Sequence, residues 1–243
     1  VFELVRSIAA GHRSPDRIYR LHAMNSPNKA ALAFRGGAYT YAELENRIER
    51  IATGLLERGF KRGGGVVLMT KNRPEFIELA AAASRVGVPA VGVSWRSTAK
   101  ELAYVVKHCG AEGILFEDEF TDVVAEARAE LMHVASERIF ALGTTPSFAR
   151  PYESVLAEKI AYESHAQSKE AGDASAVVIY TSGTTGKPKG AVRKFPKDAI
   201  TGALQFIGET PMRSDDTHLV ACPLYHSTAF GFMAFSFLLG GTV

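Results

Sequence analysis

Hydrophobic residues follow two different spacings along the chain. Short apolar runs rich in β-branched residues, such as 66–69 and 176–180, predict strands that are buried on both faces. Between such runs, apolar residues recur at every third or fourth position, as they do over 44–55, which predicts helices with one buried face. Strands are predicted over 30–34, 66–69, 90–93, 113–116, 138–142, 176–180 and 217–221. Helices are predicted to follow residues 40 and 98 and to cover 74–86, 119–133, 152–160, 196–208 and 226–239.

Two of these helices begin with the capping-box pattern. Thr40 precedes Glu43 by three residues, and Thr98 precedes Glu101 in the same way. In this pattern the hydroxyl accepts one unpaired backbone N–H, while the glutamate accepts the N–H of the capping residue. Gly59 is the predicted stop of the first helix. Both helices are therefore predicted from local chemistry as well as from periodicity.

The regular alternation of strands and helices predicts the α/β fold class. Such chains form a parallel sheet with helices on both faces. Residues 1–36 are expected to form a leader with a short helix over 1–9, and residues 164–173 are expected to be mobile. The 243 residues suffice for one large domain or two small ones.

Composition excludes several other classes of protein. The net charge of +2 gives no argument for a nucleic-acid partner. Cys109 and Cys222 lie too far apart for a disulfide framework or a metal motif, which fits a reducing compartment and predicts a cytoplasmic protein. The apolar run 230–239 is about half of the ~20 residues that a membrane span needs, so no integral membrane segment is expected.

One stretch, Tyr180–Gly190, has a composition that no packed element requires. It contains three glycines, two lysines and four serine or threonine hydroxyls, directly after a predicted buried strand. Glycines allow the backbone to approach a ligand closely, and N–H groups, hydroxyls and lysines attract phosphate. Because Pro188 follows Gly186-Lys187, the stretch is not a Walker loop, and it is not a dinucleotide fingerprint either. The alternative is a flexible surface loop.

Basic residues also gather next to this stretch. They are Lys187, Lys189, Arg193, Lys194 and Lys197. A solvated face, phosphate attraction and nucleic-acid binding are the three interpretations. The adjoining glycines favour phosphate, and no basic stripe with interleaved aromatic residues supports nucleic acid.

The stretch 181–190 resembles the signature loop of the adenylate-forming superfamily, which includes acyl-CoA synthetases, peptide-synthetase adenylation domains and luciferases. The segments 39–44, 86–106 and 223–226 are similar to further conserved elements of that family. One departure is Ser94-Trp95, where many members have Asn-Pro. The resemblance implies the N-terminal portion of a large domain built from layered parallel sheets flanked by helices.

The resemblance also implies a two-step reaction with ATP, Mg²⁺ and coenzyme A. A carboxylate attacks the α-phosphate of ATP and expels pyrophosphate, and a thiol then attacks the acyl-adenylate. The loop residues are expected to bind the β- and γ-phosphates, with Lys189 facing either phosphate or solvent. They are Thr181, Ser182, Gly183, Thr184, Thr185, Gly186, Lys187 and Lys189. Thr181 is also expected near the magnesium ion, whose carboxylate partner is expected outside this chain.

Three further residues are candidates on the acid side of the site. His226 matches the family histidine that sits by the acid carboxylate and the adenylate, which makes it the candidate catalytic residue. A core histidine and a helix cap are the alternatives. Tyr225, His226 and Phe230 are the candidate acid-binding residues. Phe230 matches an aromatic gate of some long-chain synthetases, but it also lies in an apolar helix where core packing would explain it.

The resemblance implies that 1–243 is an incomplete large domain without the small C-terminal domain, and the chain alone is expected to be inactive. Its first subdomain is expected over 40–190 and the start of the second over 191–243. The expected activity is that of a fatty-acid–CoA ligase. A peptide-synthetase domain, an aryl-acid ligase, a luciferase-like oxygenase and a non-catalytic nucleotide-binding module stay open, as do peripheral membrane association and a homodimer.

Overall fold

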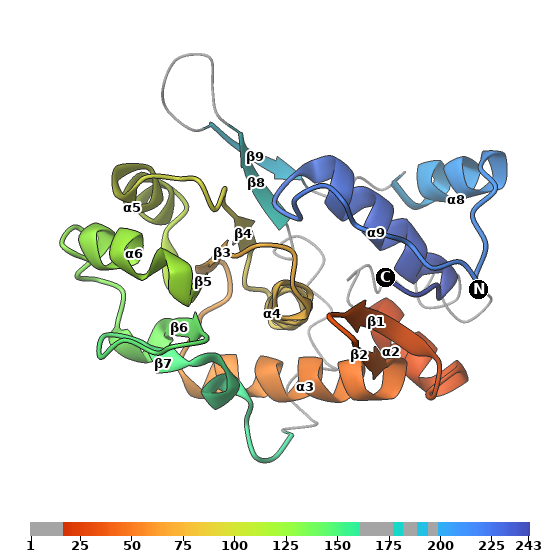
Figure 1. Ribbon diagram of the computed structural model, residues 1–243, viewed down its shortest axis with the longest axis horizontal. Coiled ribbons are helices and arrows are strands. Elements are labelled where there is room, and N and C mark those ends of the chain that lie inside the picture. Colours follow the sequence, from red (N-terminus) through yellow and green to blue (C-terminus); the bar gives the residue numbers. More distant parts are fainter. Residues whose placement is uncertain (1–16, 161–176, 182–188, 194–198) are drawn as a thin grey trace.

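A seven-stranded sheet forms the centre of the protein in the computed structural model, which describes residues 17–160, 177–181, 189–193 and 199–243 (Figure 1). Its strand order is β7-β6-β5-β3-β4-β8-β9. All neighbouring pairs are parallel except β8 and β9, which pair antiparallel. The strands are β3 (Gly65–Met69), β4 (Ala90–Gly92), β5 (Ala111–Glu117), β6 (Ile139–Leu142), β7 (Arg150–Pro151), β8 (Val177–Thr181) and β9 (Lys189–Arg193). The predicted α/β fold with a parallel sheet is confirmed.

Helices cover both faces of this sheet (Figure 1). Alternate residues of β3 belong to different cores: Val66 and Leu68 pack with α3 and α4, whereas Val67 and Met69 pack with α5 and α6. This division follows from the two-residue period of a strand, and it explains why the strand is apolar throughout. The helices are α3 (Tyr41–Glu57), α4 (Pro74–Arg85), α5 (Ala99–His108) and α6 (Thr121–Arg128).

Both capping boxes are present. Thr40 and Thr98 each accept a hydrogen bond from the backbone N–H three residues on, and Glu43 and Glu101 accept from the capping residue in return. The first helix, α3, ends before Gly59, which has a φ of 72°. A left-handed backbone of this kind suits glycine, so the predicted stop is confirmed.

A second, smaller group of elements lies beside the main sheet (Figure 1). It contains α2 (Arg17–Asn25), the hairpin β1 (Ala30–Phe34) and β2 (Gly37–Thr40), α8 (Ala199–Glu209) and α9 (Ser227–Leu239). Val243 bonds to Ala31 and Ala33 of β1, while Thr242 forms a parallel bridge with Thr217. These bonds place the last described residues between β1 and the segment around Thr217, apart from the seven-stranded sheet.

The expectation that 1–36 is a leader is wrong for the part that the structure describes. Helix α2 packs into the fold, and the ring of Tyr19 meets that of Phe237 in α9 edge-on at 4.9 Å. Its buried residues are contacted by an element more than 200 residues away, which periodicity in the leader alone does not reveal. The helix expected over 1–9 and the mobile segment expected over 164–173 lie outside the described residues.

Three other predicted elements differ from the structure. The helix predicted over 119–133 is shorter, because Leu131 and Val134 turn inward to buried positions after α6 ends. The helix predicted over 152–160 is only the 3₁₀ turn η3 (Tyr152–Val155), because Ala157 exchanges hydrogen bonds with Arg50 of α3 instead. The strand predicted over 217–221 is reduced to the single bridge at Thr217.

Helix α9 is apolar on all sides but has only 13 residues. Across the described ranges, no helix combines the length and the apolar character needed to cross a membrane.

Candidate functional site

The predicted phosphate loop leaves the sheet at its carboxyl edge. Strand β8 ends at Thr181, and β9 begins at Lys189, its antiparallel partner. Residues 182–188, and with them the candidates Ser182–Lys187, lie outside the described residues, and of Thr181 and Lys189 only the backbone is described. The structure therefore fixes the two ends of the loop. In open α/β sheets, ligands bind at this carboxyl edge.

Tyr225 lies at the same edge of the sheet, one strand away. Its backbone packs against Gly92, the last residue of β4: a Cβ at Gly92 would lie 3.1 Å from Cα of Tyr225. The Ser94 hydroxyl donates a hydrogen bond of 3.3 Å to Oη of Tyr225. Because β4 is the parallel neighbour of β8, the motif around Tyr225 and the start of the loop lie at the ends of adjacent strands.

His226 follows in a tight turn that begins helix α9. Its backbone N–H donates to the carbonyl oxygen of Pro223 at 2.9 Å, and its ring lies 4.6 Å from the ring of Tyr225. The side chain is exposed, so the alternative of a core histidine is wrong. It occupies the N-cap position of α9 without making a capping hydrogen bond, so a capping side chain does not explain it either.

Asn72 holds this turn in place, although it was not among the site residues predicted from the sequence. Its amide nitrogen donates to the carbonyl oxygens of Val220 and Cys222, both at 2.9 Å. Its amide oxygen accepts the N–H of Leu224, also at 2.9 Å. The signal in the sequence is a polar residue just beyond β3, at the edge where ligands bind.

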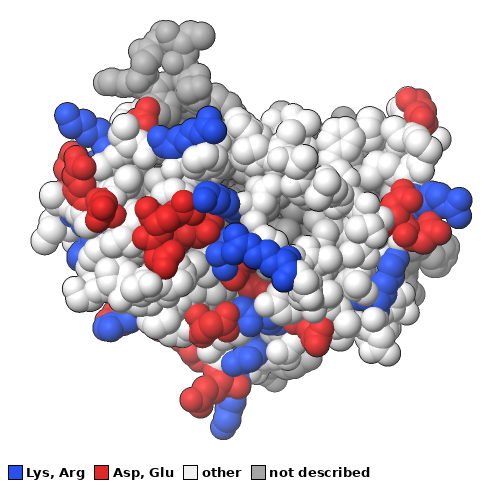
Figure 2. All heavy atoms as spheres, viewed as in Figure 1, with Lys and Arg blue, Asp and Glu red and all other residues white. Residues whose placement is uncertain are grey.

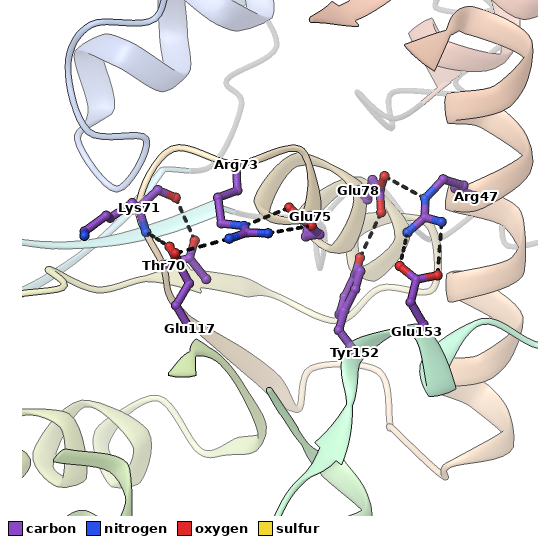
Figure 3. A network of polar contacts seen from close by, with 9 residues as sticks. All are labelled: Arg47, Thr70, Lys71, Arg73, Glu75, Glu78, Glu117, Tyr152 and Glu153. Carbon is purple, nitrogen blue, oxygen red and sulfur yellow. Dashed lines mark hydrogen bonds and ion pairs between the residues drawn. The ribbon is translucent and has the colours of Figure 1, made fainter. Parts of the chain in front are cut away.

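The segment that carries Asn72 is itself fixed by a carboxylate. Glu117, the last residue of β5, accepts the backbone N–H of Lys71 and a hydrogen bond of 3.3 Å from Arg73 (Figure 3). The Thr70 hydroxyl donates to the carbonyl oxygen of Lys71. Hydrogen bonds to Glu75 raise the pKa of Arg73, so this guanidinium stays charged. Asn72 is thus held between two residues that Glu117 anchors.

Charged side chains surround Trp95, the residue that stands at the departure from the family pattern. The guanidinium of Arg96 lies 4.5 Å from the centre of the indole ring, and Nζ of Lys71 lies 5.9 Å from it. Trp95 is partly buried against the core on the α5 side, so packing explains its position. Lys71 also pairs with Glu119.

The surface differs between the two sides of the site. Basic and acidic side chains intermingle over the α3–α6 half of the face shown in Figure 2, whereas the surface over α9 is largely uncharged. Phe230 is a partly buried residue of α9 that packs against the core. Among the described residues, no group of three histidine, cysteine or acidic side chains could hold a metal ion.

Comparison with known proteins gives the family. The family model described as "AMP-binding enzyme" matches residues 19–243. The chain belongs to this AMP-binding enzyme family. The resemblance drawn from the loop and from the 223–226 segment is thereby confirmed.

Relatives within the AMP-binding enzyme family differ in substrate. Over 91% of its length the chain is 30% identical to a feruloyl-CoA synthase of Amycolatopsis sp. and to the fatty acid–[acyl-carrier-protein] ligase ScoC of Streptomyces coeruleorubidus. The inhibitor-bound N-terminal domain of FACL13 from Mycobacterium tuberculosis superposes with a TM-score of 0.76, at 25% identity, over 95% of this chain and 57% of that one. The chain spans 41% of the length of each of the two curated relatives.

Proposed function

We propose that the protein containing this chain activates a carboxylic acid with ATP and transfers the resulting acyl group to a thiol. The observation that carries the proposal is the meeting of two motifs at one sheet edge. The loop between β8 and β9 leaves the strand adjacent to β4, and the turn with Tyr225 and His226 packs on the end of β4. An acid and a triphosphate bound at these two places would be neighbours.

The proposed division of roles follows the two motifs. The loop residues bind the β- and γ-phosphates through backbone N–H groups, hydroxyls and Lys187. His226 orients the attacking carboxylate, and Tyr225 forms a wall of the acid pocket. Positioning and charge stabilisation are the main demands of phosphoryl chemistry, because the attacking and leaving oxygens must lie in line.

Magnesium fits this arrangement as an ion held mainly by phosphate. Mg²⁺ in nucleotide sites keeps several waters and takes one or two protein ligands, so the absence of a three-residue cluster among the described residues is compatible with it. Thr181 is the last residue of β8, directly before the loop, and its hydroxyl is the proposed protein contact of the ion. The ion would neutralise phosphate charge.

A fatty acid is the proposed substrate and coenzyme A the proposed acceptor. The uncharged surface over α9 and the apolar character of that helix support an apolar acid (Figure 2). Of the two relatives named above, one carries the name of an aryl-acid enzyme and the other that of a fatty-acid enzyme that uses a carrier protein. An aryl acid and a carrier-protein thiol are therefore the direct competitors.

A product assay separates these possibilities. The full-length protein is incubated with ATP, magnesium, coenzyme A and, in separate reactions, a long-chain fatty acid, a short-chain fatty acid or a hydroxycinnamic acid. The thioester products are identified and quantified by mass spectrometry. We expect the long-chain thioester to dominate. Phe230→Ala should raise KM for the long acid by about tenfold, whereas Phe232→Ala, at a residue 40% exposed on the same helix, should not. Thioester from the hydroxycinnamic acid alone would contradict the fatty-acid assignment.

The proposed domain division follows the two groups of elements in part, since β9 crosses the boundary and α2, β1 and β2 pack with the second group. Residues 40–190 would form the first subdomain around the seven-stranded sheet, and 191–243 the start of the second. Bonds among β1, Thr217 and residues 242–243 support a second sheet beginning there.

A further inference from the structure

We propose that Asn72 is a positioning residue of the acid side of the site: its side-chain amide fixes the turn that presents Tyr225 and His226. This inference rests on the proposed function and assigns a role to a residue outside both motifs. None of these Asn72 hydrogen bonds reaches Tyr225 or His226. It acts through the backbone from Val220 to Leu224.

The bonding pattern matches an asparagine and no similar residue. The segment offers two carbonyl oxygens and one N–H, and the amide supplies two N–H donors and one acceptor. An aspartate would keep the acceptor but present a second oxygen to two carbonyl oxygens. A glutamine would move the amide outward by one methylene. All three bonds measure 2.9 Å, so each is well formed.

The support under Asn72 is rigid. It lies three residues after the end of β3, whose residues are buried, and its two neighbours in the chain are bound by Glu117 (Figure 3). Glu117 is 6% exposed and comes from the adjacent strand β5. A chain of contacts therefore runs from the centre of the sheet, through Glu117 and Asn72, to the turn before α9.

Without this side chain, the turn would lose its hydrogen bonds to the segment after β3. Tyr225 would still rest on Gly92 and accept from Ser94, and Leu224 would stay buried in the core, but packing alone would then set the path of the backbone from Val220 to Leu224. His226 is exposed and makes no capping bond, so nothing described beyond its backbone bonds and the Tyr225 ring would hold it. Small displacements of a positioning group cost large factors in rate.

The effect should be selective for the acid. ATP is assigned to the loop between β8 and β9, which the bonds of Asn72 do not touch. In full-length protein, we expect Asn72→Ala to raise KM for the acid in pyrophosphate exchange by about tenfold or more, with KM for ATP little changed. Asn25→Ala, at an exposed position at the end of α2, is the matched control and should change neither constant.

The pH dependence of the Asn72→Asp variant distinguishes a positioning role from a merely structural one. A protonated aspartate can donate one hydrogen bond to the carbonyl oxygens, whereas an ionised one cannot. Its activity relative to wild type should therefore rise as pH falls from about 8 to about 5.5, towards the pKa range of a carboxyl group. The alanine variant should show no such rise.

Amide hydrogen exchange tests the three Asn72 hydrogen bonds separately from catalysis. The Leu224 amide should lose protection in Asn72→Ala, while the amides of β3 keep theirs, which also shows that the variant folds. If the wild-type protein shows no acid-dependent pyrophosphate exchange, the proposed function fails. Loss of amide protection at Leu224 would still support the proposal that Asn72 fixes this turn. Unchanged protection at Leu224, or equal rises in KM for acid and ATP, would overturn the proposal.

Discussion

At the scale of single residues, His22 shows how burial without a partner affects stability. Its ring lies 5.0 Å from the ring of Tyr41 and against Gly240, where a Cβ would come within 2.7 Å of Cε1. Its Nε2 is buried and has no hydrogen-bond partner among the described residues. Burial, with a smaller contribution from Lys29, lowers the pKa of His22 below 6.5, although the carbonyl groups of Leu238 and Phe237 oppose this shift.

This shift predicts a pH dependence of stability. In the unfolded chain His22 binds a proton near pH 6.5, whereas in the folded chain it binds a proton only at lower pH. The stabilisation that neutral His22 gives to the folded state is therefore complete above pH 6.5. It is lost as pH falls through the lower pKa that His22 has in the folded chain. Wild-type Tm should fall more between about pH 7.5 and about pH 5.5 than that of His22→Gln, which does not titrate. Parallel Tm curves for the two proteins would contradict this.

Residues of the acid-side turn could be found from the sequence only where a local motif carries them. Tyr225 and His226 lie in a four-residue motif, and both were identified as site candidates. Asn72 was missed because its partners lie 148 to 152 residues away, and no local pattern records such bonds. The same holds for Ser94, whose hydrogen bond to Tyr225 spans 131 residues.

At the scale of elements, helix α3 contains a glycine that propensity does not explain. A Cβ at Gly54 would lie 1.6 Å from the carbonyl oxygen of Val155 in η3. The helix and the η3 turn therefore approach to backbone contact at this position. The absence of a side chain is a packing requirement, although glycine inside a helix costs about 1 kcal/mol relative to alanine.

Gly54→Ala should therefore destabilise the protein. Overpacking commonly costs about 1–3 kcal/mol, and a clash with a backbone atom should reach the top of that range or exceed it. Gly202→Ala is the matched control, because Gly202 lies in α8 with nothing within 4 Å of its Cβ position, and it should gain up to about 1 kcal/mol. Urea unfolding of the full-length proteins measures both, and equal stability of Gly54→Ala and wild type would contradict the packing argument.

Elements with local signals were predicted well, and elements fixed by distant contacts were not. The two capping boxes and the glycine stop of α3 are encoded within a few residues, and the structure confirms them. The turn η3 was predicted as a helix because its pairing with Arg50 of α3 is invisible to periodicity. Strand β9 and its antiparallel pairing with β8 were not predicted at all, because Lys189–Arg193 contains no apolar run of the kind that marks a buried strand.

At the scale of the whole molecule, the candidate site lies where two groups of elements meet. The main sheet supplies the ends of β3, β4 and β8, and the second group supplies the turn before α9 (Figure 1). Asn72 links the groups, and Tyr41 of α3 donates a hydrogen bond of 2.6 Å to the carbonyl oxygen of Gly241. Acid and nucleotide would thus be held by different parts of the fold, which suits a reaction that must bring them into line.

The measurement that tests this account most directly is carboxylate-dependent exchange of pyrophosphate into ATP by the full-length protein. We expect exchange only when an acid is present. Lys187→Ala should reduce it by about a hundredfold, as expected when a charge-stabilising group is removed, and Lys159→Ala, at an exposed lysine after η3, should leave it unchanged. Tight ATP binding without exchange in the presence of any acid would contradict the account and indicate a nucleotide-binding module without adenylation chemistry.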